Sequence, residues 1–167
     1  MFLVGVVILA SVPVLLTLAA GQLGLLRGAA PSRLGLTDGR LKPPSKTPNS
    51  VSSQADLWPG HPMRELAFIK PLPAPGAADA AWADLRAHVA AMPGARIVDA
   101  EGDYLYAQFS TRWLKFTDDA EFWLDRAAGV IHVRSASRVG RKDFGVNRAR
   151  IESLRAARGP QPTDSMR

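Results

Sequence analysis

Residues 113–138, with the sequence WLKFTDDAEFWLDRAAGVIHVRSASR, predict an antiparallel β-hairpin. Two runs in which apolar residues alternate with polar ones flank a short stretch that ends in Gly129. A turn of two or of four residues gives the same register, which places Glu121 opposite Arg134. Because side chains alternate along a strand, we expect a core face with Phe122, Leu124, Ile131 and Val133, and an opposite face with Glu121, Trp123, His132 and Arg134.

The residues around this hairpin predict one α+β domain over residues 76–158. Residues 79–92 form an amphipathic pattern in which Trp82, Leu85 and Val89 share one side, and Pro93 ends it. A second helix is expected over 145–157. The four expected strands are 96–100, 104–110, 113–125 and 130–138. The fold class is therefore helix, four-stranded antiparallel sheet, helix, with the helices on one face of the sheet.

The N-terminal residues 1–27 predict a transmembrane anchor. No ionisable side chain occurs from Phe2 to Leu26, and about 20 apolar helical residues are enough to span a bilayer core. Pro13 would kink such a helix. A cleaved signal peptide stays an alternative, because residues 17–21 imitate a cleavage site.

Residues 28–75 are rich in proline and are predicted to be irregular. The alternatives are an extended linker and a loop that wraps the domain. We favour the wrapping loop because flexible linkers seldom carry large apolar residues such as Trp58, Leu66, Phe68 and Ile69. The tail, residues 159–167, is expected to be disordered.

The chain is basic and lacks cysteine. Its net charge is +6 and its pI is about 10.3, which suits an anionic partner. We do not expect nucleic acid, because no Lys/Arg-rich helix or Cys/His finger is present. Lys and Arg beside a membrane gain from anionic headgroups, so we expect the membrane to be the partner. The absence of cysteine excludes disulfides and thiolate metal sites.

One group of residues suggests an anion site at the end of the hairpin. It extends from a strand end through a glycine-containing turn to the start of a helix, where Arg and hydroxyl groups bind anions. In the alternative, these side chains tie the turn by hydrogen bonds to Asp143, Asp118 or backbone carbonyls. The candidates are Arg134, Ser135, Ser137, Arg138, Asn147 and Arg148, with Arg141 nearby.

Asp118, Asp119 and Glu121 are candidate carboxylates for acid–base chemistry or a hard cation. A salt-bridged sheet surface is the simpler interpretation, because arginines lie across the hairpin. A serine nucleophile would need a base, and His132 is expected on the face opposite Ser135 and Ser137. The other histidines lack metal-ligand spacing, so we predict neither a catalytic residue nor a metal or other cofactor.

Three stretches resemble the family catalogued as domain of unknown function 1499. They are DDAEF at 118–122, GVIHVRSASRVG at 129–140 and DFGVNR at 143–148, and PNSVSSQ at 48–54 resembles the N-terminal signature of the family. The resemblance frames residues 41–157 and implies no activity. Where the family often has two cysteines, this chain has Pro44 and Ser50. Those cysteines imply an oxidising compartment for relatives.

These observations lead to one functional hypothesis and one alternative. We expect a single-pass, membrane-tethered, non-enzymatic module of the bacterial envelope that binds an anionic ligand, a lipid headgroup or an envelope protein. The alternative is a hydrolase that uses the paired carboxylates. The basic residues after the span favour a cytoplasmic domain by the positive-inside rule, whereas the family resemblance favours the periplasm, and we lean to the periplasm.

Overall fold

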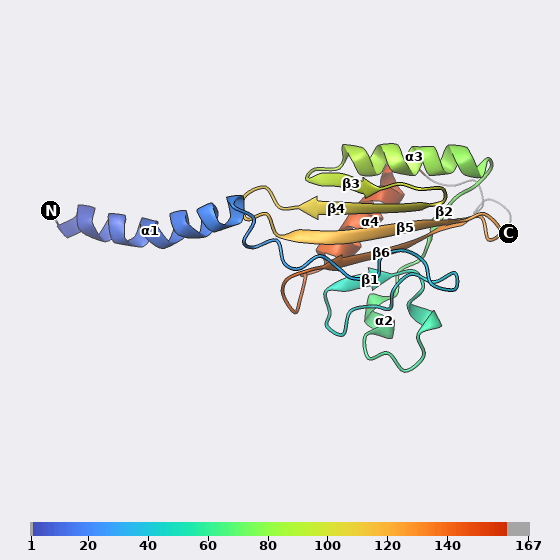
Figure 1. Ribbon diagram of the computed structural model, residues 1–167, viewed down its shortest axis with the longest axis horizontal. Coiled ribbons are helices and arrows are strands. Elements are labelled where there is room, and N and C mark those ends of the chain that lie inside the picture. The colour runs from blue at the N-terminus through green and yellow to red at the C-terminus, as the bar shows by residue number, and fades with distance from the viewer. Residues whose placement is uncertain (1, 160–167) are drawn as a thin grey trace.

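The computed structural model describes residues 2–159, which form a sheet with helices on one face and an N-terminal helix that projects from one end (Figure 1). The helices are α1 (Phe2–Gln22), α2 (Arg64–Ala67), α3 (Ala78–Ala91) and α4 (Val146–Ala157), with a 3-10 turn, η1 (Ala55–Leu57). The strands are β1 (Ser50–Ser52), β2 (Leu72–Pro73), β3 (Ala95–Asp99), β4 (Tyr104–Ser110), β5 (Thr117–Asp125) and β6 (Val130–Ser137).

The sheet has six antiparallel strands in the order β1-β6-β5-β4-β3, and β2 also pairs with β6. The expected register of the β5–β6 hairpin is confirmed, because Glu121 pairs with Arg134 and Phe122 pairs with Val133. Phe122 is fully buried, as its place on the core face requires. The α+β class and the antiparallel sheet are therefore confirmed.

The count of four strands is wrong. The segment predicted to be irregular supplies β1 and β2, which pair end to end along the outer edge of β6. These strands are three and two residues long, too short to show an alternating pattern. They are strands because β6 offers unpaired backbone groups at its edge.

The strand expected from Trp113 begins only at Thr117. Residues 111–116 form a turn in which Lys115 has a φ of 55°, a left-handed conformation that is uncommon outside glycine. The amide of Phe116 donates to the hydroxyl of Thr111 at 3.0 Å, and this bond closes the turn. Apolar residues at 113, 114 and 116 gave a false strand signal here.

Only some of the large apolar residues in the segment 28–75 are buried against the domain, although all four were expected to be. Ile69 is buried, but Leu66 and Phe68 are exposed and Trp58 is half-buried. The short helix α2 turns Ala67 towards the domain, which leaves the neighbouring large side chains outside. The predicted disordered tail falls mostly on residues 160–167, which lie outside the described residues.

The predicted N-terminal helix is confirmed as α1, and Figure 1 shows it leaving the end of the sheet where β4 finishes and β5 starts. As far as their described residues go, none of the helices is long and apolar enough to cross a membrane. The predicted span is therefore not supported.

The apolar core lies between the sheet and helices α3 and α4. The helix α3 contributes Trp82, Leu85 and Val89, and the strands contribute residues such as Leu105 and Phe122. Gly94, at φ 73°, lets the turn after α3 approach β4, because a Cβ there would lie 2.2 Å from the carbonyl oxygen of Ser110. This close approach fixes the end of α3 over the end of β4.

Candidate functional site

The alternation of side chains along β6 separates the residues predicted to bind an anion. Ser135 and Ser137 lie on the face covered by α4, whereas Arg134 and Arg138 lie on the opposite face, where they contact side chains of β5. Asn147 and Arg148 belong to the first turn of α4. The six residues therefore do not line one site.

Asn147 is the centre of a buried network on the α4 side of the sheet. Its Oδ1 accepts hydrogen bonds from the hydroxyl of Ser135 at 2.6 Å and from Arg150 at 2.7 Å. Its Nδ2 lies 3.1 Å from the carbonyl oxygen of Asn49 and 3.0 Å from the hydroxyl of Ser137. This arrangement matches the alternative in which these side chains tie the turn, because it joins β6, the residue before β1, and α4.

The free backbone amides at the start of α4 already donate to a carboxylate of the same chain, so they are not available to an external anion. The side chain of Asp143 accepts from the amides of Gly145 at 3.1 Å and Asn147 at 3.0 Å. Burial would raise the pKa of Asp143, but the hydrogen bonds from Asn147 and Gly145 outweigh burial and hold that pKa below its ordinary value. Arg148 points elsewhere and donates to two carbonyl oxygens at the end of α2, at 2.9 and 2.8 Å.

The opposite face carries a bidentate ion pair between Arg138 and Asp119. Nε and Nη2 of Arg138 lie 2.8 and 2.7 Å from the two carboxylate oxygens of Asp119, and both side chains are nearly buried. Tyr106 donates its hydroxyl to the same carboxylate at 2.6 Å. The hydrogen bond to Asp119 raises the pKa of Arg138, and burial raises the pKa of Tyr106.

Next to this pair, Glu121 and Arg134 face each other with a separation of 3.8 Å between Oε2 and Nη1. Oε1 of Glu121 accepts from the hydroxyl of Tyr104 at 2.8 Å and from the amide of Gly35 at 3.0 Å. Oε2 is buried and has no hydrogen-bond partner among the described residues. Arg134 donates to the carbonyl oxygen of Pro43 at 3.1 Å. Burial lowers the pKa of Arg134 against the opposing effect of Glu121, and burial is also the main reason why the pKa of Tyr104 is raised.

Residues 35–43 cover this charged face. Leu41 is fully buried, and its amide donates to the side chain of Gln54 at 2.7 Å. Asp119 and Glu121 thus lie beneath backbone and face arginines, and Asp118 points to the α4 side, where it lies 2.6 Å from Arg150. The three candidate carboxylates form salt bridges within the sheet, which is the simpler of the two interpretations that the sequence allowed.

A contact between Ser53 and His132 was missed by sequence reasoning. The hydroxyl of Ser53 lies 3.1 Å from Nδ1 of His132, whose Nε2 lies 3.8 Å from the carboxylate of Asp125. Trp123 stacks on the imidazole, and burial lowers the pKa of His132, which favours the neutral ring. No local signal could find this contact, because the two residues are 79 positions apart and meet through the β1–β6 pairing.

The Ser53 hydroxyl is held by backbone rather than presented to a substrate. It accepts from the amide of Val133 at 2.9 Å, and Ser53 is buried. A nucleophilic hydroxyl needs both a base and access to a substrate, and here access is lacking. Within residues 2–159, moreover, no group of three or more His, Asp or Glu side chains is arranged to hold a metal ion.

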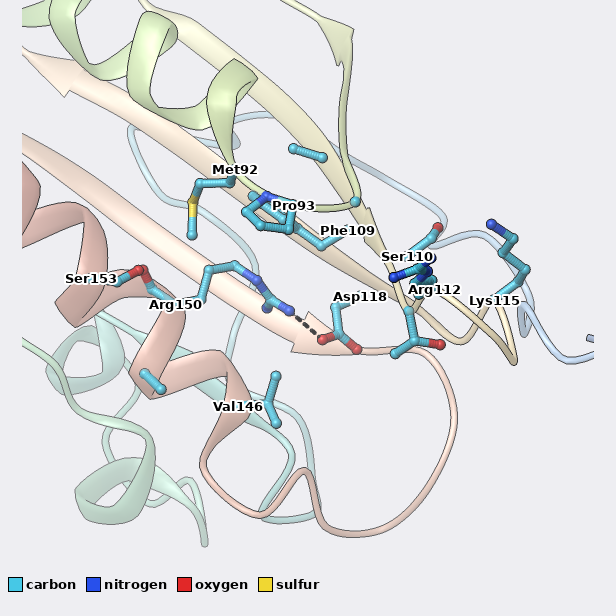
Figure 2. A pocket seen from close by; sticks show the side chains of 14 residues that line it. Met92, Pro93, Phe109, Ser110, Arg112, Lys115, Asp118, Val146, Arg150 and Ser153 are labelled. Carbon is cyan, nitrogen blue, oxygen red and sulfur yellow. Dashed lines mark hydrogen bonds and ion pairs between the residues drawn. The ribbon is translucent and has the colours of Figure 1, made fainter.

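A cavity of about 910 Å³ lies on the α4 side of the sheet, at the end from which α1 leaves. Figure 2 shows the turn after α3 on one side of it, with Met92 and Pro93, and α4 on the other, with Val146 and Arg150. The nearly buried ring of Phe109, on β4, lies between them. Much of the lining is therefore apolar.

The charges of this cavity are unevenly placed. Arg150 pairs with Asp118 and stacks over the ring of Phe109, 4.5 Å from the ring centre, so its charge is compensated. Arg112 and Lys115 belong to the 111–116 turn and lie together at one end of the cavity (Figure 2). The guanidinium of Arg112 lies over the ring of Trp113, 4.9 Å from the ring centre, and among the described residues no salt bridge joins Arg112 or Lys115 to a carboxylate. The cavity thus combines apolar walls with two available positive charges.

The comparisons with known proteins give a family but no relative of known activity. A family model described as "Protein of unknown function (DUF1499)" matches residues 40–157, more than half of the chain. No curated protein and no solved structure matches the chain. The chain therefore belongs to the DUF1499 family, as its hairpin and turn motifs predicted.

Proposed function

We propose that this protein is a membrane-tethered, non-enzymatic module that binds anionic lipid headgroups with the end of the domain from which α1 leaves. One observation carries the proposal. An uncharged helix ends against the 111–116 turn, and the residues just after the helix pass the β6–α4 loop; both loops hold basic and exposed aromatic side chains, which is the combination that favours a bilayer interface.

The helix supplies the first support. No ionisable side chain occurs between Phe2 and Leu26, and Val14, Leu15 and Leu16 on α1 are each at least 60% exposed. A row of exposed apolar side chains on a helix without charges favours contact with lipid or with another apolar surface, and we propose lipid. We therefore take α1 as the tether.

The two loops supply the second support. The 111–116 turn holds Arg112 and Lys115 beside Trp113, which is 61% exposed. The β6–α4 loop holds Arg141 and Lys142 near Phe144, whose side chain is 94% exposed. Trp is enriched at membrane interfaces, and each cation near an anionic bilayer contributes about 1 kcal/mol.

Close contacts hold both loops where α1 joins the domain. A Cβ on Gly21 would lie 2.8 Å from the backbone of Leu114, and the side chain of Gln22 donates to the carbonyl oxygen of Trp113 at 2.7 Å. A Cβ on Gly28 would lie 2.7 Å from the side chain of Val139. A bilayer that holds α1 therefore lies within reach of both loops.

The test measures amide hydrogen exchange of the full-length chain in nanodiscs of phosphatidylglycerol and of phosphatidylcholine. We expect residues 111–116 and 139–145 to exchange more slowly in the anionic nanodiscs. Arg112→Ala with Lys115→Ala should remove most of this difference. Lys70→Ala with Arg86→Ala, which removes the same charge from exposed positions outside both loops, should leave it unchanged. Equal exchange in the two lipids would refute the proposal.

The side of the membrane is a separate part of the proposal. We propose that the domain faces the periplasm, since the cysteines common in this family suit an oxidising compartment. A reporter fused after Arg167 measures the side directly. A reporter active only in the cytoplasm would reverse this assignment and would agree with the basic residues that follow the helix.

A further inference from the structure

We infer that the cavity between the α3–β3 turn, the ends of β4 and β5, and α4 binds one anionic amphiphile, a molecule with a single acyl chain and an acidic headgroup. This inference rests on the proposed function, because the bilayer beside α1 is the source of such a molecule. It adds a ligand site within the fold to a surface that contacts headgroups.

The walls of the cavity suit an acyl chain. Met92, Pro93, Phe109 and Val146 present apolar surface on three sides (Figure 2). Its volume of about 910 Å³ lies within the range of about 300–1,000 Å³ that is usual for small-molecule sites. Val146 is a large apolar side chain on α4 and is half exposed to solvent here, so an acyl chain would remove apolar surface from water.

The polar side chains on the sheet side of the cavity, around Arg150, already have hydrogen-bond partners and therefore tolerate an apolar ligand. Arg150 donates to Asp118 at 2.6 Å, to Ser135 at 2.9 Å and to Asn147 at 2.7 Å. Its guanidinium also stacks over Phe109. Because these hydrogen bonds are already made, an acyl chain can cover this side of the cavity without leaving a buried charge unpaired.

The two remaining cations define the position of the headgroup. Arg112 and Lys115 lie at the end of the cavity formed by the 111–116 turn, and the same turn contacts the last residues of α1 through Trp113 and Leu114. A headgroup bound there would meet positive charge at the level where α1 leaves the domain. The acyl chain would then extend towards Met92 and Val146.

The experiment uses the full-length chain in phosphatidylcholine nanodiscs that contain a small fraction of lysophosphatidylglycerol with a diazirine on its acyl chain. After irradiation, mass spectrometry locates the labelled residues. We expect labels within α1 and, separately, within residues 92–95, 109 and 146–153. The same diazirine on lysophosphatidylcholine should label the cavity about thirtyfold less, because two cations that each contribute about 1 kcal/mol no longer attract the headgroup. A diazirine-bearing palmitate forms a further arm, and stronger labelling by one anionic probe identifies the preferred headgroup.

Variants separate the cavity from the tether. Ala149→Trp, which fills the cavity from α4, should reduce the labelling of residues 92–95 and 109 at least about fivefold while α1 stays labelled; Val146→Trp serves as a second filling variant if the first does not fold. Arg112→Ala with Lys115→Ala should remove the preference for the anionic probe. Equal cavity labelling by the anionic and zwitterionic probes, or labelling that both filling variants leave unchanged, would overturn this inference and leave the proposed function standing. Loss of the α1 labels would instead contradict the tether.

Discussion

Both faces of the sheet are buried, but one is packed with apolar side chains and the other with paired charged side chains. On the face covered by α3 and α4, Phe122 and its apolar neighbours pack among other apolar side chains. On the opposite face, Glu121 and Arg134 are shielded to a similar degree by residues 35–43, although both are charged. The same strand β5 supplies Phe122 to one face and Glu121 to the other.

This difference indicates which face supplies stability and which one fixes the position of the covering segment. Apolar burial stabilises by about 25 cal/mol per Å². A buried ion pair often contributes little net stability, because desolvation offsets the attraction between the charges. It is, however, sensitive to the loss of either partner. The amide of Gly35 and the carbonyl group of Pro43 complete the charged face, so residues 35–43 are held by a few specific polar contacts.

The largest expected effect comes from the apolar face. Phe122→Ala should lower the free energy of unfolding by about 4 kcal/mol, because it opens a cavity among fully buried neighbours. Urea denaturation of the full-length chain in detergent micelles measures this loss. Phe144→Ala removes an equally large side chain from the surface and should change stability by less than about 0.5 kcal/mol. Similar losses for the two variants would contradict the assignment of the core face.

The second effect comes from the charged face. Glu121→Ala should cost about 3 kcal/mol, since it leaves Arg134 buried beside a single backbone acceptor and deprives the hydroxyl of Tyr104 of its carboxylate acceptor. The double variant Glu121→Ala with Arg134→Ala should recover part of this loss, and the same urea measurement reports it. Asp125→Ala, near the turn of the hairpin, should cost far less. If the loss of unfolding free energy in the double variant equals the sum of the losses in the two single variants, the two charges do not stabilise each other.

The smallest effect is a pH dependence at the edge of the charged face. Burial lowers the pKa of His132 below its ordinary value of 6.5, so the folded protein binds this proton less readily than the unfolded chain does. Stability should therefore be complete above pH 6.5 and should fall as the pH decreases below that value, by at most about 1.4 kcal/mol per pH unit for one proton. Urea denaturation between pH 8 and pH 5 tests this, and His132→Gln should remove the dependence. A wild-type protein that gains stability as the pH decreases would show that the pairing of His132 with Asp125 outweighs its burial.

The local patterns predicted the central hairpins well. The strand expected over 104–110 matches β4 residue for residue, and the pairing of Glu121 with Arg134 is the observed one. The helices α3 and α4 were predicted to within one residue at each end. These elements could be predicted because each shows its own period of apolar residues and has a glycine or proline near at least one end.

The candidate site could be predicted only as a list of residues. Arg134, Arg138 and Asn147 lie within fourteen positions of each other in the chain. In the structure, however, the two arginines lie on one face of the sheet and Asn147 lies on the other. The cavity beside α1 was not predicted at all, because its lining comes from the turn after α3, the ends of two strands and the start of α4. No window of sequence contains these segments together.

The sequence by itself determined the uncharged N-terminal helix, the α+β order of elements, the register of the β5–β6 hairpin and the family. These features depend on residues that are neighbours in the chain, and local periodicity records them. Only the tertiary structure decided that residues 35–43 cover the charges of the second face and that Ser53 meets His132. It also decided that Arg112 and Lys115 stand at one end of an apolar cavity. Those contacts join segments that are far apart along the chain, and the long-range packing that brings them together leaves no local pattern.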